Sequence, residues 1–216
     1  MIRKPLHSAQ AHWPRQLERG LEALGLQLAP ATQASLVSYL RLLEKWSQAF
    51  NLTAVRDPHA VVARHLLDSL SILPFLIGPR VLDVGTGPGL PGIPLALARP
   101  DWSFVLLDSN GKKIRFVRHA KQELALANVT AIQARVERYR CDTGFACIVS
   151  RAFAGLGEMT ELTAHLLGEG GRWVAMKGPT ETLEHAAVPA GVSITSRPVA
   201  VPGLRADHRV VILQRE

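Results

Sequence analysis

The stretch 81–92, Val-Leu-Asp-Val-Gly-Thr-Gly-Pro-Gly-Leu-Pro-Gly, limits the possible folds of this chain more than any other part. A short apolar run that carries one carboxylate, Asp83, leads into glycines at alternate positions, Gly85, Gly87 and Gly89. Glycine is favoured where the backbone takes a positive φ or where a ligand must approach the main chain closely. Together with the apolar run that follows, the stretch predicts a strand, a tight loop and a helix that bind a nucleotide-sized ligand.

After this loop, strand-like and helix-like patterns alternate along the chain. The alternation predicts a mainly parallel α/β sheet with helices on both faces. At the C-terminus two strand-like runs, 192–198 and 209–213, are joined by a segment with Pro and Gly, which predicts an antiparallel hairpin at the sheet edge. The other predicted elements are strands 103–107, 129–133, 146–150 and 172–176 and helices 112–126 and 156–167.

Before the loop, three segments carry apolar residues on one helical face: 14–25, 31–50 and 57–73. A helix with a single apolar stripe must pack that stripe on a neighbour. We therefore expect a small helical cap beside the glycine loop, preceded by a loose polar arm. The chain is thereby divided into the arm and cap, 1–76, and a main α/β domain, 77–216, which pack as one unit.

The composition limits the class of protein. The 216 residues are 47% hydrophobic and 20% charged, which is typical of a soluble globular protein. No apolar run approaches the roughly 18 residues that cross a bilayer, and the N-terminus has no signal-peptide pattern. Two cysteines, Cys141 and Cys147, and eight scattered histidines give no metal-ligand spacing. We expect a cytoplasmic protein without a metal and, although the sequence does not fix it, a monomer.

The charge balance bears on the partner. Lys and Arg number 25 against 18 Asp and Glu, which gives a net charge of +7. Arginine binds phosphate and stacks on bases, so a nucleic acid is one possible partner. An Ala- and Arg-rich composition that reflects genomic bias would give the same excess, and the charge alone does not separate the two interpretations.

The residues around the glycines distinguish between nucleotide ligands. A dinucleotide fingerprint that starts at Gly85, directly after the strand, would need its third glycine at Leu90. Asp83 would repel a pyrophosphate, whereas it can interact with the cationic amino acid group of S-adenosylmethionine. Asp108 lies where a carboxylate takes the ribose hydroxyls of a nucleotide. No Gly-Lys-Ser/Thr follows, which excludes a Walker loop, and an ordinary βα turn would not need so many glycines. S-adenosylmethionine is therefore favoured over NAD.

Further motifs carry a family resemblance. The loop 83–94 is accompanied by Trp46, Asn51-Leu52-Thr53, Arg64-His65, Leu67-Asp68-Ser69, Leu107-Asp108-Ser109, Arg135-Val136-Glu137, Ser150-Arg151-Ala152 and Lys177-Gly178. From Leu17 to the C-terminus the chain resembles the ribosomal RNA small-subunit methyltransferase G family, also known as the glucose-inhibited division protein B family. The resemblance implies a class I S-adenosylmethionine-dependent methyltransferase fold, which is Rossmann-like, and methylation of N7 of one guanine in 16S rRNA.

The resemblance also assigns residues to the donor site. It implies that the donor lies on the loop beyond Asp83, with one carboxylate near the ribose and further residues beside the adenine: Gly85, Gly87, Gly89, Leu90, Asp108, Val136 and Glu137. Arg151, at the end of the fourth predicted strand, would line the donor site or the path to the substrate. The chain departs from the family at Phe145-Ala146, where family members often have Phe-Asp, so no aspartate at this place can be assigned a role.

The chemistry of the target atom agrees with the methylation of guanine N7 that the resemblance implies. Methylation of cytosine C5 requires a nucleophilic cysteine, and neither Cys141 nor Cys147 follows a proline. Methylation of an exocyclic amine usually uses an Asp/Asn-Pro-Pro-aromatic loop, and here Ser150-Arg151-Ala152-Phe153 occupies that place. Guanine N7 carries a lone pair and no proton, so the enzyme needs only to align it with the methyl group. The absence of an acid-base pair is therefore compatible with N7 transfer.

Positioning of the guanine must come from groups near the loop side of the sheet. Arg151 and Lys177 follow strands there and are predicted to contact the base O6 or nearby phosphates. Weaker candidates for RNA contacts are Arg64, His65, His208 and Arg209. The substrate is either naked 16S rRNA or the small ribosomal subunit. Two other functions stay open at this point, a small-molecule methyltransferase with the cap as a lid and a non-catalytic RNA-binding or ribosome-assembly protein.

Overall fold

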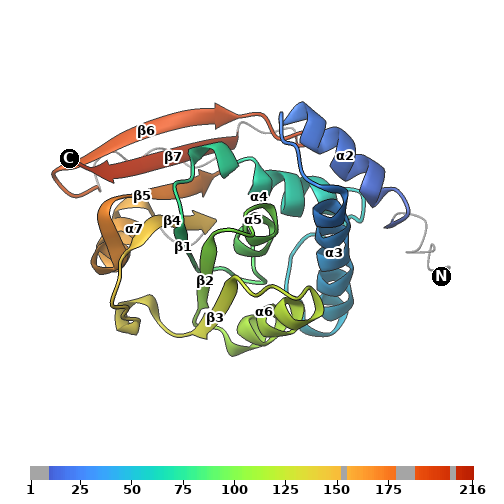
Figure 1. Ribbon diagram of the computed structural model, residues 1–216, viewed down its shortest axis with the longest axis horizontal. Coiled ribbons are helices and arrows are strands. Elements are labelled where there is room, and N and C mark those ends of the chain that lie inside the picture. The colour runs from blue at the N-terminus through green and yellow to red at the C-terminus, as the bar shows by residue number, and fades with distance from the viewer. Residues whose placement is uncertain (1–9, 152–154, 179–187, 205–207) are drawn as a thin grey trace.

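The structure is a computed structural model that describes residues 10–151, 155–178, 188–204 and 208–216. Residues 1–9 of the expected N-terminal arm lie outside the described residues. The chain forms a seven-stranded sheet with helices on both faces (Figure 1). The strands are β1 Arg80–Val84, β2 Ser103–Asp108, β3 Val129–Gln133, β4 Phe145–Arg151, β5 Leu167–Lys177, β6 Val192–Val199 and β7 His208–Arg215.

The strand order is β3-β2-β1-β4-β5-β7-β6. Strands β1 to β5 pair in parallel, whereas β7 pairs antiparallel with both β5 and β6. This confirms the expected parallel sheet with a C-terminal antiparallel hairpin. The order reverses between β1 and β4, and open α/β sheets bind ligands in the crevice outside the carboxyl ends of the strands at such a point.

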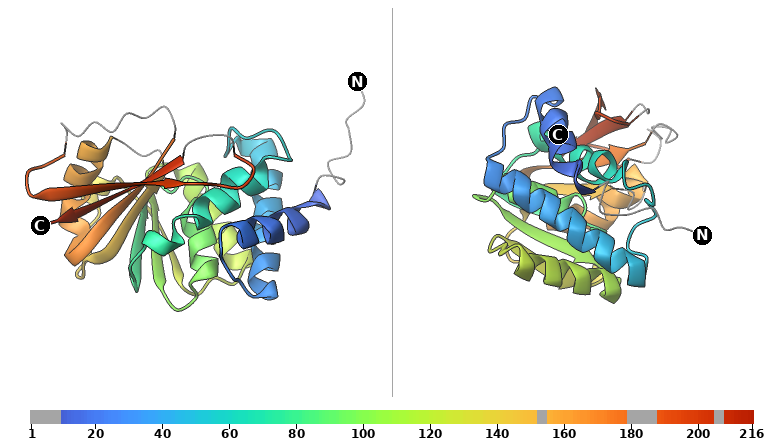
Figure 2. Two further views of the ribbon diagram at one scale, coloured as in Figure 1. Left: turned by 90° about the horizontal axis from the view of Figure 1, so that it is seen from above. Right: turned by 90° about the vertical axis from the view of Figure 1, so that its right-hand side faces the viewer.

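The helices lie in two layers. The helices and helical turns that precede β1 are α2 Trp13–Ala23, α3 Pro30–Phe50, η1 Val62–Leu67, α4 Asp68–Leu70 and η2 Leu73–Phe75. They share one face of the sheet with α5 Gly92–Ala98 and α6 Gly111–Glu123, whereas α7 Leu156–Thr163 covers the other face. Figure 2 shows α3 running beside α6, and the two helices are in contact. The cap therefore rests directly on the helices that follow the glycine loop and β2.

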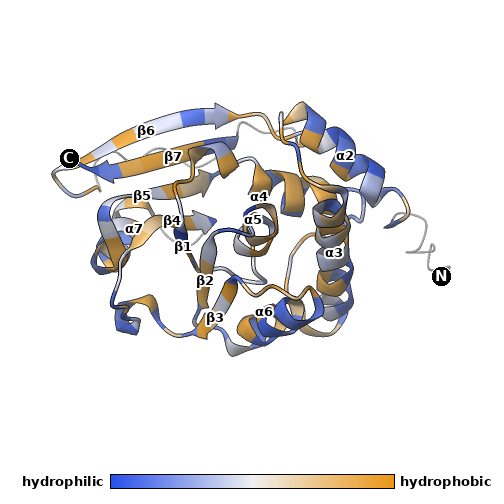
Figure 3. Cartoon of the chain, viewed as in Figure 1, coloured by the Kyte–Doolittle hydropathy of each residue, from blue (hydrophilic) through white to orange (hydrophobic). Residues whose placement is uncertain are grey.

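Apolar side chains from the strands fill two hydrophobic cores, because successive side chains of a strand point to opposite faces. Val81 and Cys147 belong to the core on the cap face, and Leu82 and Ile148 belong to the core beneath α7. The register places Val81 opposite Cys147 and Leu82 opposite Ile148, so each pair shares a face. Figure 3 shows hydrophobic colour along β7 and hydrophilic colour on outer parts of α2 and α6.

The cap and the sheet share one core. Leu36 and Leu40 of α3 lie in the same buried cluster as Ile93 and Leu95 of α5. The boundary at residue 76 is thus not marked by separate cores, and the division into two segments stays an expectation. The first two helices end as predicted, because Gly25 has φ 67° after α2 and Asn51 takes a left-handed conformation after α3.

The third predicted helix, 57–73, is present but shorter and irregular: helical residues run without a break from 61 to 70, and residues 57–60 are not helical. It consists of the π-helical turn η1, the short helix α4 and the 3-10 turn η2. The Ser69 hydroxyl donates to His65 O at 2.6 Å, and the Ser71 hydroxyl donates to Asp68 O at 2.7 Å. Such bonds to main-chain carbonyls compete with regular helical hydrogen bonding. Hydrophobic spacing alone does not reveal this competition.

The boundary between α7 and β5 also differs from the prediction. The α-helix ends at Thr163, and the 3-10 helix η4 Ala164–Leu166 continues it to within one residue of the predicted end at 167. The difference lies in the strand, because the glycine-rich run 168–171 is inside β5. β5 pairs with β4 through a register shift between Phe145 and Cys147. A Cβ on Gly144 would lie 2.4 Å from Gly168 Cα, so the strands approach here more closely than other residues allow. Gly144 and Gly168 thus permit the close approach of β4 and β5.

Within the residues that the structure describes, no helix has both the length and the apolar character required to span a bilayer.

Candidate functional site

The glycine loop joins β1 to α5 at the carboxyl edge of the sheet. Gly85, Gly87 and Gly89 have φ angles of 67°, 60° and 94°, a region that other residues rarely occupy. Thr86 N donates to Leu107 O of β2 at 3.1 Å, which fixes the loop to the neighbouring strand. The three glycines are therefore required by the backbone conformation, as the sequence predicts.

Asp83 lies beneath this loop and has no exposed surface. Its Oδ2 accepts hydrogen bonds from Thr86 Oγ1 at 2.6 Å and from Gly92 N at 2.8 Å. Its Oδ1 is buried and has no hydrogen-bond partner among the described residues. Burial raises the pKa of this carboxyl from 3.8 to about 7, although both hydrogen bonds lower it. An incompletely satisfied buried carboxylate of this kind is suited to a cationic group.

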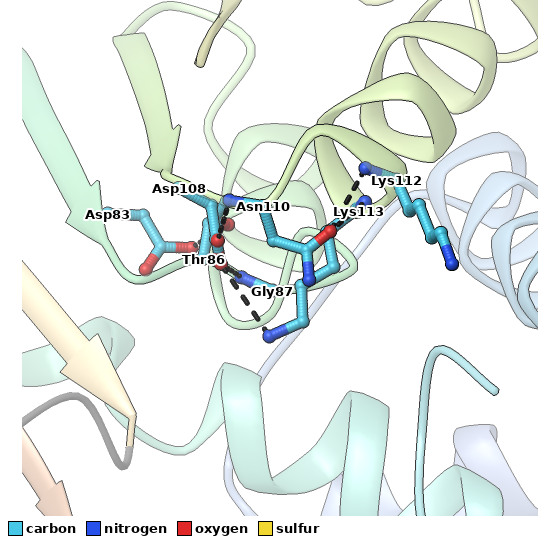
Figure 4. Close-up of polar contacts among 7 residues, drawn as sticks. All are labelled: Asp83, Thr86, Gly87, Asp108, Asn110, Lys112 and Lys113. Atoms are coloured by element: carbon cyan, nitrogen blue, oxygen red, sulfur yellow. Dashed lines mark hydrogen bonds and ion pairs between the residues drawn. The ribbon is translucent and has the colours of Figure 1, made fainter. Parts of the chain in front are cut away.

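Asp108 at the end of β2 holds the other side of the loop (Figure 4). Its Oδ2 accepts a hydrogen bond from Gly87 N at 2.9 Å, and its Oδ1 accepts one from Asn110 N at 2.8 Å. Lys113 Nζ lies 3.8 Å from Oδ2. The Asn110 side chain caps α6 by accepting hydrogen bonds from the first-turn amides. The carboxylate and the start of α6 are therefore fixed by the same few contacts.

A cleft of about 370 Å³ opens beside Asp108 at the carboxyl ends of β1 and β2. It brings together four residues of the predicted donor set, which are Gly85, Asp108, Val136 and Glu137. The others line no part of it: Leu90 is 2% exposed, and its amide donates to Thr86 O at 2.9 Å within the loop. The full lining is Val84, Gly85, Leu107, Asp108, Ser109, Lys113, Ala134, Arg135, Val136, Glu137, Glu158 and Leu162.

A second cavity, of about 240 Å³, lies at the carboxyl ends of β4 and β5 and the start of β7. It is lined by four of the predicted substrate-contacting residues, namely Arg151, Lys177, His208 and Arg209. Asp68 also lines this cavity, with Arg151 Nη1 at 3.5 Å from its Oδ2 and His208 Nδ1 at 3.4 Å from its Oδ1. We call it the Asp68 cavity. On sequence grounds Asp68 is part of a motif only and has no assigned role.

The remaining two RNA-contact candidates lie on η1. The His65 side chain is 3% exposed, and its Nε2 lies 3.1 Å from Thr53 Oγ1. Burial lowers the pKa of His65 to about 4, so the ring is neutral at physiological pH. Arg64 is exposed, and its carbonyl accepts a hydrogen bond from Arg151 Nη1 at 3.0 Å. Arg64 is thus available at the surface, whereas His65 is enclosed in the cap and is the weakest of the four candidates.

Cys147 is not placed to act as a nucleophile. Cys147 lies in the core of β4 with no exposed surface, and burial raises the pKa of its thiol to about 12. A thiol of this kind is protonated at physiological pH and is a poor nucleophile. Among the residues that the structure describes, no group of three or more His, Cys, Asp or Glu is arranged to hold a metal ion.

Comparison with known proteins gives the family. The family model described as rRNA small subunit methyltransferase G matches residues 32–212. The chain belongs to the rRNA small subunit methyltransferase G family. A relative from Methylococcus capsulatus named ribosomal RNA small subunit methyltransferase G is 50% identical over 92% of this chain and 97% of its own. A relative of the same name from Erwinia tasmaniensis is 45% identical over 93% of this chain and 98% of its own.

Solved structures agree on the fold. A putative O-methyltransferase from Klebsiella pneumoniae matches with a TM-score of 0.61 and 14% identity, covering 96% of this chain and 99% of its own. A SAM-dependent methyltransferase from Aquifex aeolicus matches with a TM-score of 0.55 and 16% identity, covering 76% of this chain and 96% of its own. The class I methyltransferase fold is thereby confirmed. Membership in the methyltransferase G family confirms the expected enzyme class, an S-adenosylmethionine-dependent methyltransferase.

Tyr39 links the cap of this methyltransferase G family member to its glycine loop. The Tyr39 side chain is fully buried in α3, and its hydroxyl donates to Pro88 O at 2.9 Å. We expect Tyr39→Phe to leave that carbonyl without its partner, which typically costs about 1–3 kcal/mol of stability. Urea unfolding measures this loss, and calorimetry with S-adenosylmethionine measures the weaker donor binding that we expect with it. Unchanged stability and donor affinity would contradict the proposed link.

Proposed function

We propose that this chain transfers a methyl group from S-adenosylmethionine to N7 of a specific guanine in 16S rRNA. The match of the methyltransferase G family model to residues 32–212 carries this proposal. Two features of the site support it. The glycine loop and its two carboxylates suit a cationic nucleoside donor, and the Asp68 cavity is lined by cations that suit RNA. A small-molecule methyltransferase and a non-catalytic RNA-binding protein are the alternatives that a methylation assay tests.

The residues of the cleft fit the methyl donor. Asp83 does not line the cleft but lies buried beneath the glycine loop, where its oxygen without a partner would favour the positively charged amino acid end of a donor resting on the loop. Asp108 lines the cleft at the end of β2, the place at which a carboxylate takes ribose hydroxyls. Val136 and Glu137 line the cleft further along, where an apolar side chain and a polar edge suit adenine. Gly85, Gly87, Gly89 and Leu90 form the loop against which the donor would rest.

The chain does not need to supply a general base that removes a proton. When bound, S-adenosylmethionine supplies a methyl group activated by the positive sulfonium. Guanine N7 carries a lone pair and no proton, so the residues of the chain must hold and orient the base and exclude water. Arg151 lines the Asp68 cavity, and its positive charge opposes the rise in pKa that burial causes in both Asp68 and Asp83. We infer that Arg151 and Lys177 orient the substrate.

The physiological substrate is the small ribosomal subunit or its RNA, met in the cytoplasm by a monomer of this chain. The net charge of +7 supports an RNA partner. N7 is hidden in the narrow major groove of an RNA helix, so the target guanine must lie in a loop or be turned out of its stack. The exposed Arg64 side chain and His208 are candidate contacts to the RNA backbone around it.

One assay separates the three functions. Labelled S-adenosylmethionine is incubated with the protein and, in parallel, with 30S subunits, naked 16S rRNA or deproteinised tRNA, and nucleosides are then analysed by mass spectrometry. We expect 7-methylguanine in the ribosomal samples only. Donor binding without any RNA methylation would favour a small-molecule methyltransferase. Association with the subunit without methyl transfer would favour an RNA-binding or assembly protein.

Removing either strand-end cation should impair catalysis. We expect Arg151→Ala and Lys177→Ala each to lower the rate of methyl transfer or the affinity for RNA by about 10- to 100-fold, since hydrogen bonds from charged groups are worth about 1.5–3 kcal/mol. Single-turnover rates and RNA binding measure the effect. Arg99→Ala is the matched control, because this exposed arginine follows α5 at the opposite edge of the sheet. If both site variants behave like the control, their proposed role is wrong.

A further inference from the structure

The Asp68 cavity has the size and lining of a nucleobase pocket. Its volume is about 240 Å³, and its walls are partly apolar, with Ile72, Met176, Val199 and Val210. Such side chains suit the two flat faces of a base. The charged residues of the cavity, which include Asp68, suit the polar edge of a base. The cavity lies on the side of β1 that faces β4. Arg151 at the end of β4 lines it, and two residues earlier Val149 pairs with Asp83 of β1, the strand that leads into the glycine loop.

Asp68 is the only acidic side chain in the described lining of this cavity. Its two neighbours, Arg151 and His208, approach at 3.5 Å and 3.4 Å, which is longer than the roughly 2.7–2.9 Å of a charge-assisted hydrogen bond. Burial raises the pKa of the Asp68 carboxyl, and the Arg151 guanidinium opposes this rise. Neither neighbour takes a short hydrogen-bonding position on the carboxyl oxygens. An acceptor with two oxygens, 9% exposed and facing a base-sized cavity, is available for a ligand with two adjacent donors.

Guanine is the base that carries such donors. Its N1–H and N2 amino group lie side by side and can pair with both oxygens of one carboxylate. N7 lies on the far side of the purine from the N2 amino group, so a base held in this way leaves N7 open. Adenine presents an unprotonated N1 on the same edge, and its lone pair would face the carboxylate. One residue would thus select guanine and turn its reactive nitrogen away from the protein contact.

We propose that the Asp68 cavity binds the target guanine and that the Asp68 carboxylate accepts hydrogen bonds from guanine N1–H and the N2 amino group. The inference rests on the proposed function, because it assigns the substrate pocket of that reaction. Asp68 is then the residue that determines base specificity. Arg151 and His208 hold its carboxylate in place, and the apolar wall supports the ring.

The test pairs a protein change with a substrate change. Small subunits are reconstituted with 16S rRNA that carries either guanosine or inosine at the methylated position, because inosine lacks only the N2 amino group. Wild type and Asp68→Asn are compared on both substrates by single-turnover methyl transfer at saturating S-adenosylmethionine. Asp142→Asn, an exposed change before β4, is the matched control. Donor affinity by calorimetry and the unfolding midpoint report whether Asp68→Asn leaves the fold and the donor site intact.

We expect inosine to slow the wild type by about 10- to 100-fold and Asp68→Asn to slow transfer to guanosine by a similar factor, as for other hydrogen bonds to charged groups. The two changes act on one contact, so Asp68→Asn on inosine should be no more than a few-fold slower than either change alone. Losses that multiply would mean that Asp68 acts only through the protein structure, and the inference would be overturned.

Two outcomes do not depend on the folding of the variant. If the wild type methylates inosine as fast as guanosine, the contact to the N2 amino group is refuted without any variant. If the wild type forms no 7-methylguanine on guanosine-containing subunits, the proposed function itself fails and this inference fails with it. Formation of 7-methylguanine together with multiplying losses refutes the inference alone.

Discussion

Asp83→Asn is expected to weaken S-adenosylmethionine binding by at least about 100-fold, because it removes the charge opposite a buried cation, a loss that typically costs about 3–5 kcal/mol. The variant keeps the local structure, since the asparagine oxygen can still accept the hydrogen bonds from Thr86 Oγ1 and Gly92 N. Only the oxygen without a partner becomes an amide nitrogen. Calorimetry measures the donor affinity, and we expect methyl transfer at sub-saturating donor concentrations to fall with it.

The same substitution should change how stability depends on pH. Burial raises the pKa of Asp83 from 3.8 to about 7, so the folded state binds a proton more tightly than the unfolded state does. This contribution to stability is fully present below pH 3.8 and is lost as the pH rises to about 7. A tenfold difference in proton affinity corresponds to about 1.4 kcal/mol, so the contribution of Asp83 protonation to the free energy of unfolding at low pH is a few kcal/mol. Asparagine does not titrate, and the stability of Asp83→Asn relative to wild type should therefore improve between pH 4 and pH 7.

The ionised form of Asp83 is the one that attracts a cation. Donor affinity of the wild type should therefore rise with pH and level off above about pH 7, near the pKa of this carboxyl. Asp101→Asn is the control, because this exposed residue precedes β2 at the other edge of the sheet. A donor affinity that stays within a few-fold of wild type in Asp83→Asn would refute the proposed contact. A relative stability that is independent of pH would refute the assigned titration.

The glycine loop and the positions of its carboxylates were predictable because their signals are local. Three glycines within five residues fix a loop whose φ angles require them, and the strands on either side follow from short apolar runs. The strand 129–133 occurs within the predicted bounds, as β3. Asp108 directly follows such a run, so its place at the end of β2 needs no knowledge of distant contacts. The prediction of the loop therefore rests mostly on backbone conformations that a short stretch of sequence determines.

The residues of the Asp68 cavity were predictable only as separate candidates. Asp68, Arg151 and His208 come from α4, β4 and β7, and their meeting depends on how the cap packs on the sheet. Tyr39 is separated from Pro88 by 49 positions, and its hydroxyl contact with the loop has no local signal. His65 adjoins an exposed arginine in the sequence, yet the helical turn directs it into the core. Contacts of this kind follow from tertiary packing, which hydrophobic spacing does not encode.

Gly92→Ala is expected to destabilise the fold by about 2–4 kcal/mol, the range for added volume in a packed core together with a strained hydrogen bond. A Cβ at this position would lie 2.7 Å from Asp83 Oδ2 and 2.8 Å from Leu106 Cγ. Neither neighbour can move freely, because Asp83 is held by Thr86 and Leu106 is a fully buried residue of β2. Relief of these two close contacts therefore requires a shift of α5 away from β1. This shift would also break the hydrogen bond from Gly92 N to Asp83.

The donor site should respond to the same shift, since the Gly92 amide joins the start of α5 to Asp83, which also holds the loop through Thr86. Urea unfolding measures the stability of Gly92→Ala, and calorimetry measures its donor affinity, which we expect to fall together with stability. Gly155→Ala is the matched control: a Cβ there meets nothing within 4 Å, and its φ of −58° suits alanine. A Gly92→Ala protein as stable as this control would mean that α5 can move from β1 at little cost. The close packing of α5 against Asp83 would then not be what fixes the geometry of the glycine loop.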